Sequence, residues 1–209
     1  MQQLVNIYAI FHRLLDKTRH LDFLGPLALR LYLAPIFWAA GTNKLSHFES
    51  TAQWFGNAEW GLGLPMPGVL AALAIAAEIG GAVALLAGVA VRWAAIPLMI
   101  TMAVAAVTAH WTNGWHALPE SELTVPWEWR TDLIEMAADR KAAAVSLLET
   151  HGHYGWLTEA GSFTILKNGI EFAATYFIML LVLFFTGAGR YASIDYWLKR
   201  KWGSALEQS

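Results

Sequence analysis

Four charged side chains and one histidine lie within or beside apolar segments that are long enough to cross a lipid bilayer. They are Arg30, Lys44, Glu78, His110 and Glu171. A charged side chain inside a membrane is costly and normally faces protein or water, so each is a candidate for a functional site. The two bases and two acids cancel in charge, and we expect them to pair in the low-dielectric interior.

The depth of each residue in the membrane limits which bases and acids can pair. Arg30 and Lys44 are 14 positions apart on one helical stripe, which places them about 21 Å apart along the helix axis. Lys44, His110 and Glu171 are expected near the outer side. Glu78 lies deeper and can reach Lys44, or meet Arg30 through its long side chain or a water. This predicts a polar centre open mainly to the outside; the alternative is that the pairs only hold helices together.

These residues lie on four segments that each have about the 20 mainly apolar residues a spanning helix needs. The segments are residues 25–47, 68–88, 92–111 and 169–189. The second carries small residues at a spacing of four, which predicts close approach of a neighbouring backbone; they are Ala72, Ala76, Gly80, Ala84 and Gly88. We therefore predict an all-α integral membrane protein, a four-helix bundle forming a single domain over residues 1–209.

The basic residues predict the orientation of the chain. Lys and Arg gather in the N-terminal flank, the turn between the second and third segments and the C-terminal tail, whereas residues 48–67 contain none. Since cytoplasmic loops are enriched in Lys and Arg, both termini are expected in the cytoplasm. Apolar residues at helical spacing in the first 20 positions predict an N-terminal helix at the membrane interface.

The loop at residues 112–168 is expected on the outer side and to be partly helical. Residues 130–150 are rich in helix-forming residues. Histidines occur in the loop as His151 and His153, and His110 is followed by His116. Imidazoles can bind zinc or copper, but the spacings match no metal template, so no metal site is predicted.

Composition excludes several classes of function. The chain of 209 residues contains no cysteine, which rules out iron–sulfur clusters, covalently attached haem and thiol chemistry. The net charge of −2 argues against nucleic-acid binding. Any redox chemistry would need a dissociable cofactor or substrate.

Three stretches of sequence are similar to the DoxX family of small four-helix membrane proteins. They are "GTNKL" in the first segment, "AAEIGGAVALLAGVAVRWAAIPL" across the second and third, and "AVTAHWTNGW" at the end of the third. The C-terminal sequence from "LTEAGSFTILKNGIEF" resembles the HvfX-like branch of that family. The resemblance implies a multi-pass protein of the bacterial inner membrane.

The resemblance also suggests functions. DoxX relatives are tied to quinone-linked oxidation of sulfur compounds or to stress complexes, and the HvfX-like branch to maturation and export of copper-related modified peptides. We therefore expect a quinone-linked redox subunit with a protein partner that carries redox centres. The alternatives are a non-enzymatic accessory of a maturation or export complex, and a transporter of small molecules or lipids. Whether the protein is an enzyme, and whether it forms homo-oligomers, stays open.

The same motifs assign roles to residues. Lys44, Glu78 and His110 are the catalytic candidates. The cofactor stays open. In the redox hypothesis it is a quinone, whose carbonyl Arg30 or Lys44 would polarise while Glu78 or His110 exchanges protons. The ligand-binding candidates are Arg30, Asn43, Trp111 and Glu171.

Overall fold

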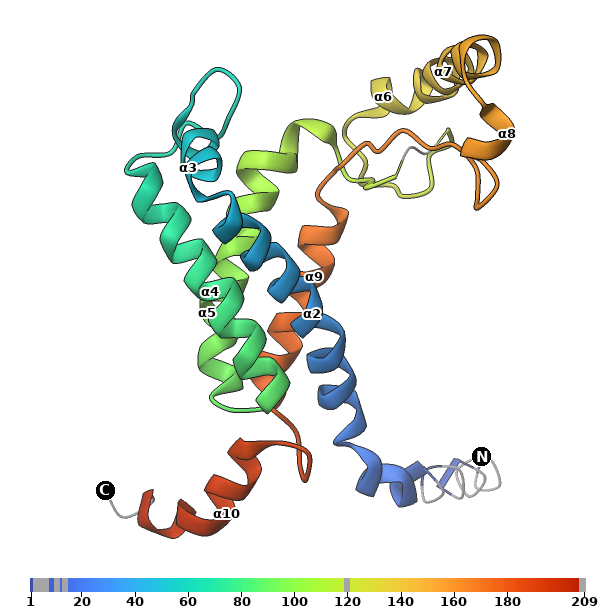
Figure 1. Ribbon diagram of the computed structural model, residues 1–209. Coiled ribbons are helices and arrows are strands. Elements are labelled where there is room, and N and C mark those ends of the chain that lie inside the picture. The colour runs from blue at the N-terminus through green and yellow to red at the C-terminus, as the bar shows by residue number, and fades with distance from the viewer. Residues whose placement is uncertain (2–7, 10–11, 13–14, 119–120, 207–209) are drawn as a thin grey trace. The chain divides into compact units, whose positions relative to one another are not determined.

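The computed structural model describes residues 1, 8–9, 12, 15–118 and 121–206 (Figure 1). All regular elements in this part of the chain are helices. The N-terminal interfacial helix predicted from the sequence falls largely on positions outside the described residues. Tyr8, His12 and Leu15, which do lie among them, are helical.

The chain divides into two compact units, residues 1–100 with 178–209 and residues 101–177. The helices of the first unit are η1 (Lys17–Leu21), α2 (Leu24–Ser46), α3 (Phe48–Gly56), α4 (Pro67–Ala87) and α10 (Ile194–Leu206). Two further helices, α5 (Val91–Val104) and α9 (Glu171–Thr186), each begin in one unit and end in the other.

The second unit contains η2 (Ala105–His110), a π-helix, followed by η3 (Trp111–Asn113), α6 (Thr131–Glu135), α7 (Ala137–His151) and α8 (Tyr154–Leu157). The predicted helix over residues 130–150 is confirmed, with a break at Met136 that separates α6 from α7. In contrast, α3 was not predicted: residues 48–56 were expected to be loop.

Among the described residues, three helical stretches are long and apolar enough to cross a bilayer, namely Lys17–Ser46, Pro67–Ala87 and Val91–Asn113. They correspond to the first three predicted spans. The fourth, α9, has 16 residues, or about 24 Å of helix, which is shorter than the ~30 Å hydrocarbon core. Its sequence from Phe172 to Thr186 nevertheless carries no charged side chain.

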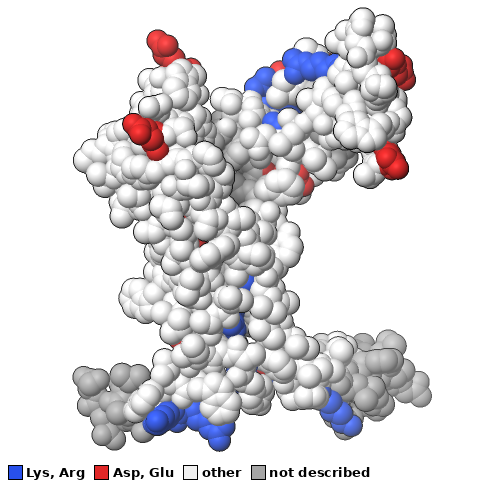
Figure 2. Space-filling model, in the orientation of Figure 1, with Lys and Arg blue, Asp and Glu red and all other residues white. Residues whose placement is uncertain are grey.

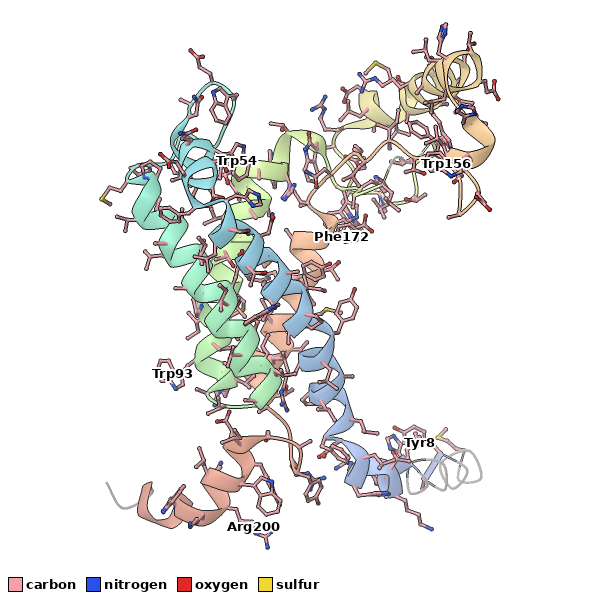
Figure 3. All side chains as sticks on the ribbon, in the orientation of Figure 1. Tyr8, Trp54, Trp93, Trp156, Phe172 and Arg200 are labelled. Carbon is pink, nitrogen blue, oxygen red and sulfur yellow. The ribbon has the colours of Figure 1, made fainter. Side chains whose placement is uncertain are left out.

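The first unit shows the surface pattern of a membrane protein along its length. In Figure 2, basic side chains gather over α10 and acidic ones over the α3 region, with a largely uncharged face between. Exposed tryptophans occur at both ends: Trp54 on α3 and Trp93 at the start of α5 (Figure 3). Tryptophan is enriched at membrane–water interfaces, so these positions fit the two edges of an apolar band.

Helices α2 and α4 pack against each other, and glycine allows the close approach. A Cβ at Gly41 would lie 2.7 Å from Ile79 Cγ1 and 3.0 Å from Glu78 Cβ. A Cβ at Gly81 would likewise meet Leu98 of α5, at 2.7 Å.

The close approach predicted along the small-residue stripe is not seen over its first three residues among the described part of the chain. Ala72, Ala76 and Gly80 are exposed in the structure, and a Cβ at Gly80 would meet nothing within 4 Å. The buried face is the one that carries Ala71, Ile75, Glu78 and Leu85. The apolar residues beside Glu78 therefore decide which face of α4 is packed.

Candidate functional site

The Lys44 ammonium group binds both carboxylate oxygens of Glu78. Nζ lies 2.9 Å from Oε1 and 2.8 Å from Oε2. The Glu78 side chain is 4% exposed, whereas that of Lys44 is 26% exposed. Of the two sequence-based alternatives for Glu78, pairing with Lys44 is thus the one the structure contains. Solvent or a ligand can therefore reach the ammonium group of Lys44, whereas the carboxylate that it binds is buried.

The backbone of α2 places Lys44 for this contact. Gly41 is buried one turn before Lys44 and lets α2 lie directly against the Glu78–Ile79 segment of α4. At i and i+3 on a helix, Gly41 and Lys44 share one face. The helix ends at Ser46, two residues after Lys44, so Lys44 lies in the last turn, where a cation is favoured by the helix dipole.

Arg30 has a different role from the one expected, because its partners are carbonyl groups and not an acid of the spans. Its Nε donates to the carbonyl of Leu85 at 2.7 Å, and Nη2 to that of Leu86 at 3.1 Å. Nη1 donates to the carbonyls of Ala188 and Ala192, at 2.8 and 3.0 Å. The side chain is 1% exposed. The alternative in which Glu78 pairs with Arg30 is therefore wrong.

The Arg30 contacts satisfy carbonyl groups that the end of α4 leaves without intrahelical partners. Gly88 closes α4 with φ of +67°, and a Cβ there would lie 2.5 Å from Arg30 Nη2. Asp195 of α10 completes the turn, since its two oxygens accept the N–H groups of Ala90 and Val91 at 2.7 and 3.1 Å. Arg30 is thus a structural residue that joins α2 to the α4–α5 turn and the start of α10.

His110 ends the π-helical turn η2 in the second unit. Its Nδ1 lies 2.9 Å from the carbonyl oxygen of Asn168, which also accepts from Asn113 Nδ2 at 3.2 Å. A carbonyl only accepts, so Nδ1 carries the proton and, in the neutral ring, Nε2 holds the lone pair. π-Helical turns are rare and are frequent at functional sites. The arrangement leaves His110 Nε2 as a proton acceptor.

The predicted ligand-binding residues of the second unit have local partners. Glu171 Oε2 accepts the Ala117 N–H at 2.9 Å, in the first turn of α9, where an acid is favourable. Trp111 is 51% exposed and stacks on Trp129 with ring centroids 4.6 Å apart. In the first unit, the side chain of Asn43, next to Lys44, is exposed.

The second unit contains a buried carboxylate that the sequence did not reveal. Glu128 accepts hydrogen bonds from Lys167 Nζ at 2.8 Å and His116 Nδ1 at 2.7 Å. The N–H groups of Trp115 and Arg130 donate to it as well, at 3.1 and 2.8 Å. The Glu128 side chain is fully buried and that of Lys167 is 9% exposed. We call Glu128 and these four donor residues the Glu128 cluster.

Electrostatics keep Glu128 ionised. Burial acts to raise the pKa of its carboxyl, but the hydrogen bonds from Lys167, Arg130, His116 and Trp115 outweigh it and hold the pKa well below that of an ordinary glutamate. His116 Nε2 lies 2.7 Å from Thr124 Oγ1, so the imidazole links two loop segments. A carboxylate whose ionised form accepts so many hydrogen bonds fixes a loop and is poorly suited to exchanging protons.

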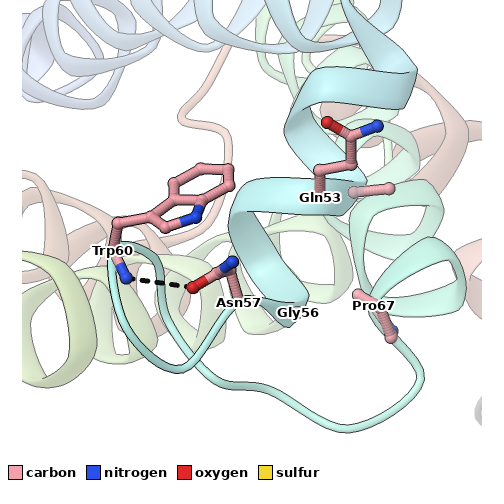
Figure 4. Close-up of a pocket in the computed structure, with 6 residues that line it drawn as sticks. Gln53, Gly56, Asn57, Trp60 and Pro67 are labelled. Atoms are coloured by element: carbon pink, nitrogen blue, oxygen red, sulfur yellow. Dashed lines mark hydrogen bonds between the residues drawn. The ribbon is translucent and has the colours of Figure 1, made fainter.

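The pocket in Figure 4 lies between α3 and the start of α4 and has a volume of about 490 Å³. Asn57 Oδ1 accepts the backbone N–H of Trp60 at 3.0 Å, which holds the loop beside it. The lining residues are Ala52, Gln53, Gly56, Asn57, Trp60 and Pro67. None of them titrates near neutral pH, so this pocket has no group for acid–base chemistry.

Together, the apolar helices of spanning length and the ion pair buried between α2 and α4 define a helical membrane protein. Residues 25–111 match the DoxX family model, so this part of the chain is similar to the DoxX family. The matched region contains Lys44, Glu78, Arg30 and His110, and it confirms the resemblance seen in the sequence. No curated protein and no solved structure matches the chain.

Proposed function

We propose that this protein is a quinone-linked redox subunit of a bacterial inner membrane and that the Lys44–Glu78 pair is its ligand site. The observation that carries the proposal is the asymmetry of the pair: an almost fully buried acid held by a base that is 26% exposed. A ligand carbonyl can take one N–H of the ammonium group, which has three donors, while Glu78 keeps another.

A quinone suits this site chemically. It dissolves in the apolar phase around α2 and α4, offers carbonyl oxygens to Lys44, and takes up protons when it is reduced. Glu78 would exchange those protons. Because the sequence contains no cysteine, the electrons would pass to or from a partner subunit.

Two features support the proposed topology of four spans with both termini in the cytoplasm. Arg92 of α5 donates to the Phe184 carbonyl of α9 at 2.8 Å, and Arg30 binds the carbonyl of Ala188 just after it. These contacts anchor the end of α9 at the α4–α5 turn. The basic residues of α10 follow at the same end, which by the positive-inside rule faces the cytoplasm.

Native mass spectrometry of the detergent-purified protein with a short-tailed benzoquinone tests the site. We expect a quinone adduct on the wild type that is lost in Lys44→Ala and Glu78→Gln. The matched controls are Lys141→Ala on α7 and Glu49→Gln on α3, which remove the same side chains elsewhere and should keep the adduct. An adduct on all five proteins, or on none, would contradict the proposal.

A second candidate function is favoured by α7. None of its residues is buried, and Leu147 is 63% exposed, so the helix presents a free face to a protein partner. In this reading the protein is an accessory of a membrane complex, such as one that matures or exports copper-related modified peptides. Replacing residues 131–157 by a short linker, with the Glu128 cluster retained, should then abolish co-purification of that partner while quinone binding is unaffected.

A further inference from the structure

The C-terminal helix α10 combines aromatic and basic side chains on one short segment. Trp197 and Trp202 are 51% and 50% exposed. Lys199, Arg200 and Lys201 are consecutive. The guanidinium of Arg200 lies 5.5 Å from the Trp197 ring centroid and Lys201 Nζ lies 4.8 Å from that of Trp202. Helices with this composition lie in the membrane interface with their rings among the lipid headgroups.

The fold fixes where α10 begins. Asp195, in its first turn, binds the N–H groups of Ala90 and Val91, and the Asp195 N–H donates to the Gly88 carbonyl at 2.9 Å. Arg30 holds the carbonyl of Ala192 just before the helix. Since α4 and α5 are apolar helices joined by this turn, α10 starts at the point where the helical hairpin leaves the bilayer.

The local charges leave the three consecutive cations available. Asp195 is engaged by the turn, and Arg190 forms its ion pair with Asp22 at 2.7 Å. Within the described part of the chain, none of the ion pairs involves Lys199, Arg200 or Lys201. The segment is therefore a positively charged patch directly at a bilayer surface.

From these observations we infer that α10 is a binding site for anionic phospholipid headgroups, with Lys199, Arg200 and Lys201 contacting phosphate and the tryptophans inserted beside them. The inference is independent of the quinone proposal, because it depends on the tether to the α4–α5 turn and not on Lys44 or Glu78. A juxtamembrane cation contributes about a five-fold increase in affinity for an anionic surface.

The test compares two variants that remove the same adjacent pair of residues. The chain contains Arg–Lys twice, as Arg200–Lys201 on α10 and Arg140–Lys141 on α7. The full-length protein and the variants Arg200→Gln/Lys201→Gln and Arg140→Gln/Lys141→Gln are titrated in detergent with phosphatidylglycerol or phosphatidylcholine. Bound lipid is counted by native mass spectrometry, and thermal unfolding confirms that all three proteins are folded.

We expect the α10 variant to bind phosphatidylglycerol roughly 30-fold more weakly than the wild type, and the α7 variant to bind within two-fold of it. Phosphatidylcholine binding should be equal in all three. Raising the ionic strength should weaken phosphatidylglycerol binding to the wild type. Equal phosphatidylglycerol binding by the wild type and the α10 variant, or an equal loss in both variants, would overturn the inference.

Discussion

Glu78 and Glu128 are both buried carboxylates, yet the structure holds them in different ways. Glu78 shares both oxygens with the ammonium group of Lys44, which is itself partly exposed. Glu128 is surrounded by two side-chain donors and several backbone N–H groups, and its main cation, Lys167, is nearly buried. A group that many buried donors hold in one state builds structure, whereas a group held by one partly exposed cation can change partner or protonation state.

The comparison predicts a large loss of stability when Glu128 is replaced by glutamine and a small one when Glu78 is. Glu128→Gln removes the charge that compensates Lys167 and leaves that cation buried, which should destabilise the second unit by about 3–5 kcal/mol. Glu78→Gln should cost about 1 kcal/mol or less, as polar contacts between membrane helices usually do, because Lys44 can turn toward solvent. Hydrogen exchange over residues 114–130 and 168–171 reports the first effect, and thermal unfolding in detergent the second.

Glu122 is exposed and provides the control for the Glu78→Gln and Glu128→Gln variants. Glu122→Gln should leave both the hydrogen exchange and the thermal unfolding unchanged. Similar losses of stability in the Glu78 and Glu128 variants would show that both carboxylates are structural, and would remove the basis for treating Lys44–Glu78 as a ligand site.

Arg30 is a third buried charge and extends the comparison. The hydrogen bonds of its side chain described above all go to neutral carbonyl groups. Arg30→Lys keeps the charge but replaces a planar fork of five donors by a compact group with three. At least one carbonyl of Leu85, Leu86, Ala188 or Ala192 then loses its donor, so the free energy of unfolding should fall by about 2–4 kcal/mol. Thermal or detergent-induced unfolding measures it.

Arg92→Lys is the matched control, because Arg92 is exposed and donates to the carbonyl of Phe184. Arg92→Lys should lower the free energy of unfolding by well under about 1 kcal/mol. Equal losses for the two arginines would argue that a retained positive charge at this end, and not the set of carbonyl contacts, determines stability.

The sequence predicted four spanning helices, and three of them are confirmed, because long apolar segments follow from the bilayer thickness alone. It also placed Lys44 within reach of Glu78, since depth along two neighbouring helices is set by residue count. It failed for Arg30, whose partners are backbone carbonyls that no residue type reveals. Glu128 was missed for a related reason: His116 and Lys167, which bind it, are 12 and 39 positions away in a loop without periodicity.

The two glycines of the α2–α4 pair give the smallest and most local test of the site. Alanine at Gly41 must displace Ile79 and the adjacent α4 backbone, whose N lies 3.1 Å from the new Cβ. This overpacking should cost about 1–3 kcal/mol, against a gain of up to about 1 kcal/mol in helix propensity. Gly80→Ala meets nothing within 4 Å and should show that gain alone.

Because the displaced segment carries Glu78, Gly41→Ala should also weaken quinone binding, whereas Gly80→Ala should not. If both alanines stabilise the protein and leave binding intact, close packing at Gly41 does not position Lys44 against Glu78, and the pair forms through the flexibility of the lysine side chain alone.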